Sequence, residues 1–369
     1  MIRYLVKLTP IGVYTFGTDQ NYPFPGENYG KPSYIAETNL WPEQTTILGM
    51  LRYEILRNKS MIKDKNDYTC DELKKIEAII GSDGFDFSSS ANTLGLIEGI
   101  SPVFLMKEDG GTDHILIKTP FNHINIEEKD SLEYEPICMN ETLITSYGDS
   151  EGIKVPGVIE IEYEGKKKTV YQYNAKKGYT RSFLDIDTGK LDKEDVFNVI
   201  TRTGNWIDGT VQGNNGLFKI RQVLIKEGYA FGVEVESSED CFTQDSVVKM
   251  GKNGSLFKAE FKKLSPGQDS FEDKVAKALC SNPTVKKRDE IWYYALSDLV
   301  LENTQYRKFC IVEEKSIRNI GRKGKRSFMR QNLVRSGSVF FEDEPLLTDN
   351  DSLRKIGYNR VIKISALEG

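Results

Sequence analysis

The stretch Thr45–Asn58, which reads TTILGMLRYEILRN, decides the fold because it predicts an amphipathic helix soon after an N-terminal strand. Residues 2–9 alternate charged and apolar side chains, as a half-buried strand does. Thr45 or Thr46 is expected to be the N-cap of the helix, since threonine is favoured at that position. Five apolar residues recur at helical spacing and form the predicted buried face: Ile47, Leu48, Leu51, Ile55 and Leu56.

Working outward from this helix, the sequence predicts strand, helix, two strands, turn and strand across residues 1–264. A shortened version of the same order follows across 265–369. We therefore expect an α+β fold with two ferredoxin-like domains, the first carrying a large insertion at about 82–200. Within the insertion, 158–163 and 169–173 alternate around a Glu164-Gly165 turn and predict a projecting β-hairpin. Residues 16–41 are rich in Gly, Pro, Tyr and Asn and predict a long loop.

Composition narrows the class of protein. The chain has 369 residues, a net charge of −5 and no apolar run long enough to cross a membrane. Five scattered cysteines without a C-x-x-C motif favour reduced thiols, so we expect a cytoplasmic protein. The two histidines, His114 and His123, match no common ligand pattern, so neither a metal nor another cofactor is expected. Common catalytic motifs, such as the P-loop and G-x-S-x-G, are absent from the sequence.

The segment 315–341 is strongly basic and contains no Asp or Glu. Removing its eight positive charges from a net charge of −5 leaves about −13 for the rest of the chain. Such asymmetry indicates a surface for a polyanion, although a solvated basic loop is the alternative. The segment ends in a Ser-Gly turn before an apolar strand. Its candidate RNA-binding residues are Arg318, Arg322, Lys323, Lys325, Arg326, Arg330, Arg335, Ser336, Gly337 and Ser338.

Three other places are candidates for RNA contact. The start of the first helix, with Thr45, Thr46 and Arg52, is a potential anion site, or simply a capped helix. Lys252 lies in a turn that is a candidate for RNA contact, and the alternative is a turn without a functional role. The hairpin at 158–181 offers tyrosines for stacking and lysines for phosphates, or it is a charge-protected edge. Its candidate residues are Lys167, Lys168, Tyr173, Lys176, Lys177, Tyr179 and Arg181.

Five stretches, in order, resemble the motifs of one family. Residues 39–52, NLWPEQTTILGMLR, resemble the first-helix motif of CRISPR type III-B RAMP proteins, in particular the third-subunit family of the Cmr effector complex. Residues 202–204 with 216–218 resemble the central strand pair of that family. Residues 250–254 resemble its glycine-rich turn, although with one glycine fewer and with Lys252. Residues 334–341 and 356–359 resemble its late strand motif and the close of its second domain.

This resemblance implies two ferredoxin-like (RRM/RAMP) domains, divided at about 264, with a thumb hairpin at about 156–182. It implies a non-catalytic subunit that grips the crRNA 5′ handle. Its partners would be target RNA near the guide start, the large palm-domain subunit and the backbone RAMP subunits. Handle binding would fall on the candidate residues of 45–52, 252 and 315–338, and guide–target contact on the thumb.

Two rival functions stay open. The first is a RAMP-type endoribonuclease that cuts precursor crRNA, because a fold does not set a function. Such an enzyme would need a histidine near the RNA, and His114 and His123 lie in the insertion, away from the expected groove. The second rival is a protein-interaction scaffold that docks basic partners on its acidic surface.

Overall fold

The computed structural model describes residues 1–23, 34–64, 67–82, 84–124, 133–144, 152–173, 181–207, 215–251, 254–286, 290–302, 308–318 and 330–365. The chain forms two compact units. Unit 1 comprises residues 1–108, 195–266 and 316–331, and unit 2 comprises 109–194, 267–315 and 332–369. This grouping differs from a single cut at 264, because residues 109–194 of the expected insertion pack with the C-terminal part of the chain.

Unit 1 is built on an antiparallel sheet with the N-terminal strand β1 (Ile2–Pro10) at its centre. Tyr4, Val6 and Leu8 of β1 are fully buried, which is the alternation that the sequence predicts for a half-buried strand. β1 pairs on one side with β15 and on the other with β17. The further strands that unit 1 contributes to this sheet are β4 (Ile97–Ile100), β5 (Phe104–Asp109), β15 (Tyr229–Ser237), β16 (Ser246–Met250) and β17 (Ser255–Lys263).

The first helix of unit 1 confirms the predicted helix, but its cap differs from the prediction. The N-cap of α1 (Gln44–Asn58) is Glu43 rather than Thr45 or Thr46, and the carbonyl of Glu43 accepts from the amides of Thr46 and Ile47. The predicted threonine cap is therefore wrong, because the helix starts one residue before Thr45. α2 (Cys70–Ile80) begins with a capping box formed by Thr69 and Glu72.

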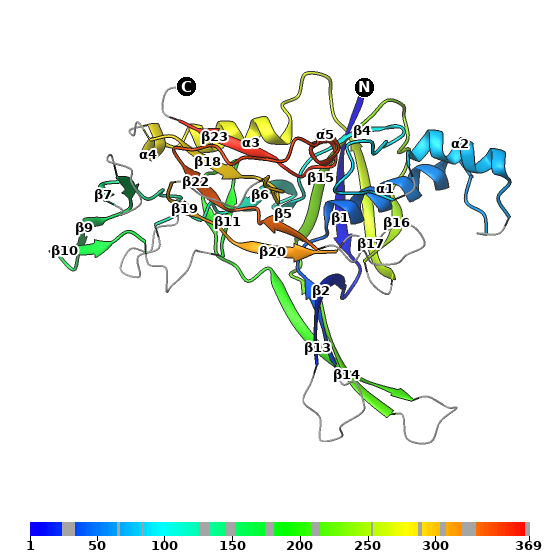
Figure 1. Ribbon diagram of the computed structural model, residues 1–369, viewed down its shortest axis with the longest axis horizontal. Coiled ribbons are helices and arrows are strands. Elements are labelled where there is room, and N and C mark those ends of the chain that lie inside the picture. Colours follow the sequence, from blue (N-terminus) through cyan, green and yellow to red (C-terminus); the bar gives the residue numbers. More distant parts are fainter. Residues whose placement is uncertain are drawn as a thin grey trace. The chain divides into compact units, whose positions relative to one another are not determined.

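A second sheet of unit 1 contains the longest hairpin of the described chain. β13 (Phe197–Ile207) and β14 (Asn215–Ile225) pair antiparallel over their full lengths, and Figure 1 shows them as a long narrow ribbon. β3 (Tyr34–Asn39) adds to β14 in parallel, and β2 (Phe16–Pro23) pairs with β3. The prediction of a loop over 16–41 is thus wrong for these two strands, which pair with each other and, through β3, with β14.

Unit 2 contains a four-stranded antiparallel sheet in the order β19-β22-β18-β23. Three further strands of unit 2 come from the expected insertion and pair in the order β6-β11-β12. These elements are β6 (Thr112–Lys118), β11 (Phe183–Asp185), β12 (Leu191–Asp192), β18 (Trp292–Ala295), β19 (Cys310–Ile311), β22 (Val339–Phe341) and β23 (Val361–Ile364). The helices are α3 (Phe271–Cys280), α4 (Pro283–Lys286) and α5 (Asp351–Lys355).

The hairpin expected near 158–173 is present. β9 (Val158–Tyr163) and β10 (Lys166–Tyr171) pair antiparallel and are joined through Glu164 and Gly165, both at positive φ. A smaller pair, β7 (Glu141–Leu143) and β8 (Ile153–Val155), precedes it. The remaining strands are β20 (Glu314–Ile317) and β21 (Gln331–Val334).

The described elements form a mixed α+β fold that is dominated by sheets and has few helices, which confirms the predicted class. The ferredoxin-like connection of each domain and the thumb role of a hairpin stay predictions. No helix within the described ranges has the length and apolar character needed to cross a bilayer.

Candidate nucleic-acid interface

The basic run 315–341 lies partly outside the described residues, which leaves out Arg322, Lys323, Lys325 and Arg326. Two of its other cations are paired with acids of unit 2. Lys315 Nζ lies 2.5 Å from Asp298 Oδ2, and the Lys315 side chain is only 13% exposed. Arg335 Nη1 lies 3.2 Å from Glu313 Oε1. These pairs reduce the positive field that Lys315 and Arg335 can present to a polyanion.

Lys118 is a third cation of unit 2 that interacts with Asp298. Burial lowers the pKa of Lys118 to about 8. Repulsion from Lys315 and Arg335 also lowers this pKa, whereas attraction to Asp298 raises it. Burial on its own raises the pKa of Asp298, but the attraction of Lys315 and Lys118 outweighs it and lowers the pKa. The carboxylate of Asp298 therefore serves as the shared counter-ion of two lysines, one at the end of β6 and one on β20.

The predicted RNA-binding turn at 335–338 is held by partners within unit 2. Ser336 N donates to Asp298 Oδ1 at 2.9 Å, and Ser338 is fully buried, with its Oγ accepting from Glu313 N at 3.3 Å. The two serines thus attach the turn to Asp298 and Glu313, the residues whose carboxylates pair with Lys315 and Arg335. Their predicted contact with RNA stays a prediction.

Gly337 sits between them in a conformation that requires glycine. Its φ is +98°, and a Cβ added there would lie 2.5 Å from Cε1 of Phe121. Gly337 N donates to Ala295 O at 2.8 Å, and its own carbonyl accepts from Phe121 N at 2.9 Å. The glycine of this motif therefore allows a close approach of protein to protein, and its predicted contact with RNA stays a prediction.

The two remaining cations of the run, Arg318 and Arg330, belong to unit 1 and differ in exposure. Arg330 is exposed and Arg318 is half-buried. Arg330 is the described member of the run that is most accessible to a polyanion.

The candidates at the start of α1 are less accessible than expected. Arg52 is 9% exposed, and its Nη2 donates to the carbonyl of Thr93 at 2.9 Å, so this guanidinium holds the segment after α2. Thr45 and Thr46 lie half-buried in the first helical turn. Lys252 lies outside the described residues.

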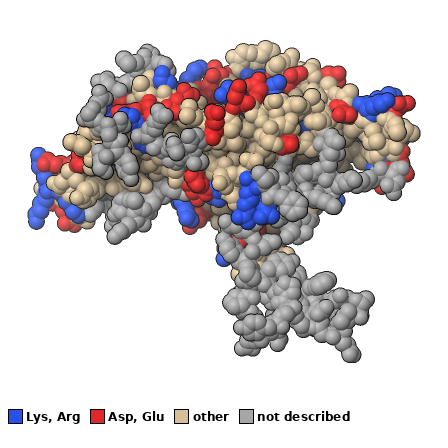
Figure 2. Space-filling model, viewed as in Figure 1, with Lys and Arg blue, Asp and Glu red and all other residues tan. Residues whose placement is uncertain are grey.

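The strands β9 and β10 with the turn between them carry balanced charge, whereas the whole predicted thumb at 156–182 has six cations and three acids. Residues 158–171 contain three glutamates and three lysines. Lys167 Nζ lies 3.3 Å from Glu160 Oε2, and Lys168 lies over the Tyr163 ring at 5.7 Å. Figure 2 shows basic and acidic atoms beside each other at this hairpin. A neutral hairpin offers little long-range attraction to RNA.

The remaining candidates of the thumb have mixed surroundings. Tyr173 packs edge-on to Phe309, with ring centroids 6.1 Å apart, and burial raises the pKa of its hydroxyl. Arg181 is exposed. Lys176, Lys177 and Tyr179 lie outside the described residues.

The ribbon β13–β14 is a basic element that residue-by-residue reasoning missed. Residues 196–226 contain four cations and one acid, a net charge of +3. Arg202 and Arg221 are exposed, and Arg221 Nη1 lies 3.1 Å from Glu37 Oε2 on β3. The sequence did carry a signal for this element, because Lys and Arg outnumber Asp and Glu within 196–226. The cations are Arg202, Lys219, Arg221 and Lys226.

An aromatic cluster anchors the root of this ribbon. Phe231 of β15 is fully buried, and its ring centroid lies 5.7 Å from Trp41, 5.8 Å from Tyr14 and 6.3 Å from Phe197 of β13. Edge-on and tilted ring pairs of this kind add to the stabilisation from area burial. Tyr14 also bridges Val223 of β14 through two backbone hydrogen bonds of 2.8 and 2.9 Å. The ring contacts and the backbone hydrogen bonds therefore hold the base of the ribbon against the main sheet of unit 1.

These features agree with a class of protein that holds nucleic acid through charge on a sheet-rich scaffold. The family model described as CRISPR-associated protein (Cas_Cmr3) matches residues 7–286. The chain therefore belongs to the Cas_Cmr3 family, which confirms the resemblance seen in its sequence motifs.

Solved structures with a similar arrangement have low sequence identity. A chain of the cryo-EM structure of the type III-B Cmr-beta bound to cognate target RNA is 14% identical, with a TM-score of 0.47, covering 99% of this chain and 97% of that chain. A chain from the same complex with target RNA and AMPPnP is 13% identical, with a TM-score of 0.45 and coverages of 99% and 100%. A chain of the Csm3-Csm4 subcomplex of a type III-A CRISPR-Cas interference complex is 12% identical, with a TM-score of 0.35 and coverages of 93% and 94%. No curated protein matches the sequence.

Proposed function

We propose that this chain is a non-catalytic RNA-binding subunit of a type III-B CRISPR (Cmr) interference complex, which grips the crRNA 5′ handle. The observation that carries the proposal is membership of the Cas_Cmr3 family over residues 7–286. The basic, acid-free run at 315–341 supports an RNA contact. Docking to the large palm-domain subunit and to the backbone RAMP subunits follows from the same family membership.

Two basic regions share the RNA contact in this proposal. The run 315–341 holds the handle, with Arg330 as its most accessible described cation. The ribbon β13–β14, with a net charge of +3 over 196–226, competes with the neutral β9–β10 hairpin for the contact with the guide–target duplex. Charge along the paired strands favours the ribbon, because β13 and β14 carry three cations and no acid, and phosphate contacts supply most of the affinity of sequence-independent binding.

The surroundings of the two histidines support a non-catalytic role over the endoribonuclease alternative. His123 is 7% exposed, stacks on Tyr134 and accepts from Glu135 N through Nδ1 at 3.2 Å. His114 Nδ1 lies 3.2 Å from Asp185 Oδ2. A general base must reach the proton that it removes, and the buried, hydrogen-bonded imidazole of His123 is poorly placed for that.

The binding test uses a variant with five cations of the run changed to Ala: Arg322, Lys323, Lys325, Arg326 and Arg330. We expect its affinity for crRNA to fall by about 100-fold and the slope of log K against log salt to become shallower by about 3, since each phosphate contact contributes about 0.7 for single strands. A matched control replaces five exposed lysines elsewhere: Lys74, Lys75, Lys262, Lys263 and Lys277. Equal affinities and slopes in both variants and the wild type would remove the proposal.

The catalytic alternative has its own test. Purified chain is incubated with repeat RNA in EDTA, and the products are resolved by size. Intact RNA is expected. Specific cleavage that is lost in a His123→Ala variant would favour the endoribonuclease.

A further inference from the structure

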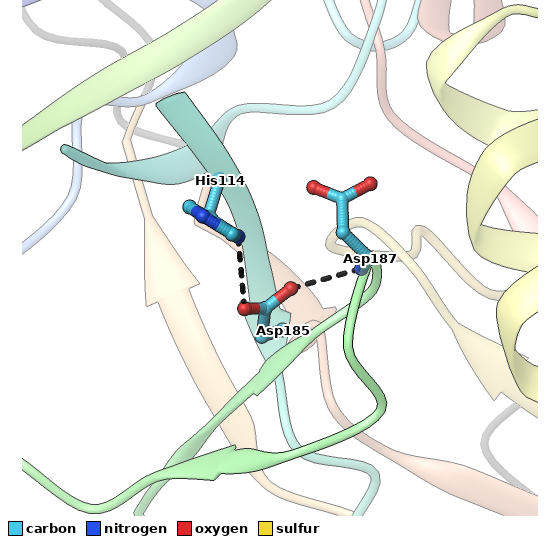
Figure 3. Close-up of side chains that lie close together, drawn as sticks. All are labelled: His114, Asp185 and Asp187. Carbon is cyan, nitrogen blue, oxygen red and sulfur yellow. Dashed lines mark hydrogen bonds and ion pairs between the residues drawn. The ribbon is translucent and has the colours of Figure 1, made fainter. Parts of the chain in front are cut away.

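Three potential metal ligands converge in unit 2, away from the charge cluster at Asp298. His114 lies on β6, Asp185 at the end of β11, and Asp187 in the turn that follows (Figure 3). One ligand atom of each residue lies within 4.8 Å of the other two. This cluster combines one imidazole with two carboxylates, which is a donor set that divalent metal ions accept.

The backbone brings the three residues together. β11 pairs antiparallel with β6, with Asp185 opposite Leu116, and Ile186 N donates to Ile115 O at 3.1 Å. This pairing places the residue after Ile186 beside the residue before Ile115. The turn then closes through Gly189, whose amide donates to the carbonyl of Asp185 at 2.8 Å. The ladder and the turn therefore fix the positions of the three side chains before any ligand arrives.

The carboxylate of Asp185 is oriented by the same turn. Its Oδ1 accepts from the amides of Asp187 at 2.9 Å and Thr188 at 3.1 Å. Its Oδ2 is left to face His114 Nδ1 at 3.2 Å. Such hydrogen bonds to the outer oxygen of a carboxylate are what holds a metal ligand in place at protein sites.

The ring nitrogen of His114 supplies a second and independent indication. Nδ1 is buried, yet among the described residues it makes no hydrogen bond of acceptable geometry, although Asp185 Oδ2 lies only 3.2 Å away. A buried nitrogen without a hydrogen bond is costly. A cation between Nδ1 and the two carboxylates removes this cost.

We propose that His114, Asp185 and Asp187 bind one divalent transition-metal ion, such as Zn²⁺ or Mn²⁺. The imidazole favours these ions over Mg²⁺, and the two carboxylates balance the charge. The His114 and Asp185 side chains are 24% and 15% exposed, and Asp187 is exposed, so an ion reaches the site from the side of Asp187. Three protein ligands leave further coordination positions to water. The bound ion would fasten the turn after β11 to β6.

The test uses the full-length chain, stripped with EDTA and dialysed against metal-free buffer. Isothermal titration with ZnCl₂, MnCl₂ and MgCl₂ is expected to show one saturable site for Zn²⁺ or Mn²⁺, with weaker binding of Mg²⁺. The Asp187→Asn and His114→Gln variants are expected to bind the same ion at least about tenfold more weakly, since even outer partners of metal ligands contribute 10- to 100-fold. Asp113→Asn is the matched control, because it removes a carboxylate next to His114 that is not part of the cluster.

Melting temperatures in EDTA show whether a variant that binds metal more weakly is still folded. Asp187→Asn and the control are expected to melt with the wild type in EDTA, while only the wild type and the control gain stability when the metal is added. Absence of saturable binding to the wild type, or equal binding by all variants, would overturn the proposal and leave a His114–Asp185 ion pair only. The outcome is independent of RNA binding.

Discussion

The hairpins β9–β10 and β13–β14 share an alternating sequence pattern but differ in charge and in how they are anchored. Residues 158–171 carry three acids and three bases, whereas residues 196–226 carry one acid and four bases. The first is tied at its end by the amide side chain of Gln172, which is 2% exposed, and the second by the aromatic cluster around Phe231. Tyrosines and lysines in a hairpin therefore indicate a nucleic-acid contact only when the acids beside them are counted too.

The largest expected effect concerns the root of the ribbon. Phe231→Ala removes a fully buried ring that contacts Tyr14, Trp41 and Phe197. We expect the free energy of unfolding to fall by about 3–5 kcal/mol, as for other large-to-small changes of buried aromatics. Urea unfolding measures it. Tyr171→Ala on β10 is the control, because that side chain is 74% exposed, and a change within about 0.5 kcal/mol is expected there. Similar losses in both variants would contradict the difference in anchoring.

The next effect concerns the charge of the ribbon. Changing Arg202, Lys219 and Arg221 to Ala removes three of its four cations. We expect affinity for a crRNA–target duplex to fall by about 10- to 100-fold at physiological salt, with a salt slope shallower by about 2 to 3. Filter binding at several salt concentrations measures both quantities. An unchanged slope would show that the ribbon does not touch phosphates.

A smaller effect is expected at the anchor of the β9–β10 hairpin. Gln172 Nε2 donates to Cys138 O at 2.9 Å, and its Oε1 accepts from Cys138 N at 2.7 Å. Gln172→Ala leaves these backbone groups without that partner and is expected to cost about 1–3 kcal/mol. Hydrogen exchange should speed up in β9 and β10 and stay unchanged in β13 and β14. Uniform acceleration across both hairpins would mean that Gln172 supports the whole chain.

The smallest effect is expected from the lysines of β10. Changing Lys166, Lys167 and Lys168 to Ala should alter affinity for the same duplex by less than about threefold, because the ribbon makes the phosphate contacts in this proposal and Lys167 is already paired with Glu160. A loss as large as that of the ribbon variant would restore β9–β10 as the thumb.

Much of the fold follows from local signals in the sequence. The alternation of 2–9, the helical spacing of 45–58 and the turn at Glu164 and Gly165 each predict an element that the structure confirms. The strands β2 and β3 could not be found in this way, because β3 depends on pairing with β14, about 180 residues later in the chain, and β2 depends on pairing with β3. Strand propensity is set by such partners more than by the local sequence.

The candidate site was less predictable than the fold. The basic run at 315–341 was visible in the sequence, but the acids that pair with Lys315 and Arg335 are Asp298 and Glu313, from outside the run. The burial of Arg52 and the packing of Gly337 against Phe121 likewise depend on distant contacts. The convergence of His114 with Asp185 and Asp187 across 70 residues depends on the pairing of β6 with β11.

The central position of β1 has a consequence for synthesis of the chain. Ile2 is paired with Ser237, and Tyr4 with Lys263, so β1 leaves the ribosome well before the strands on either side of it have been made. At roughly 5–20 residues per second this delay is on the order of 10–50 s. During that interval an apolar strand is open to unwanted association, and folding dominated by such distant pairing is slow. Nascent chains that stop before β15 should therefore be especially dependent on chaperones.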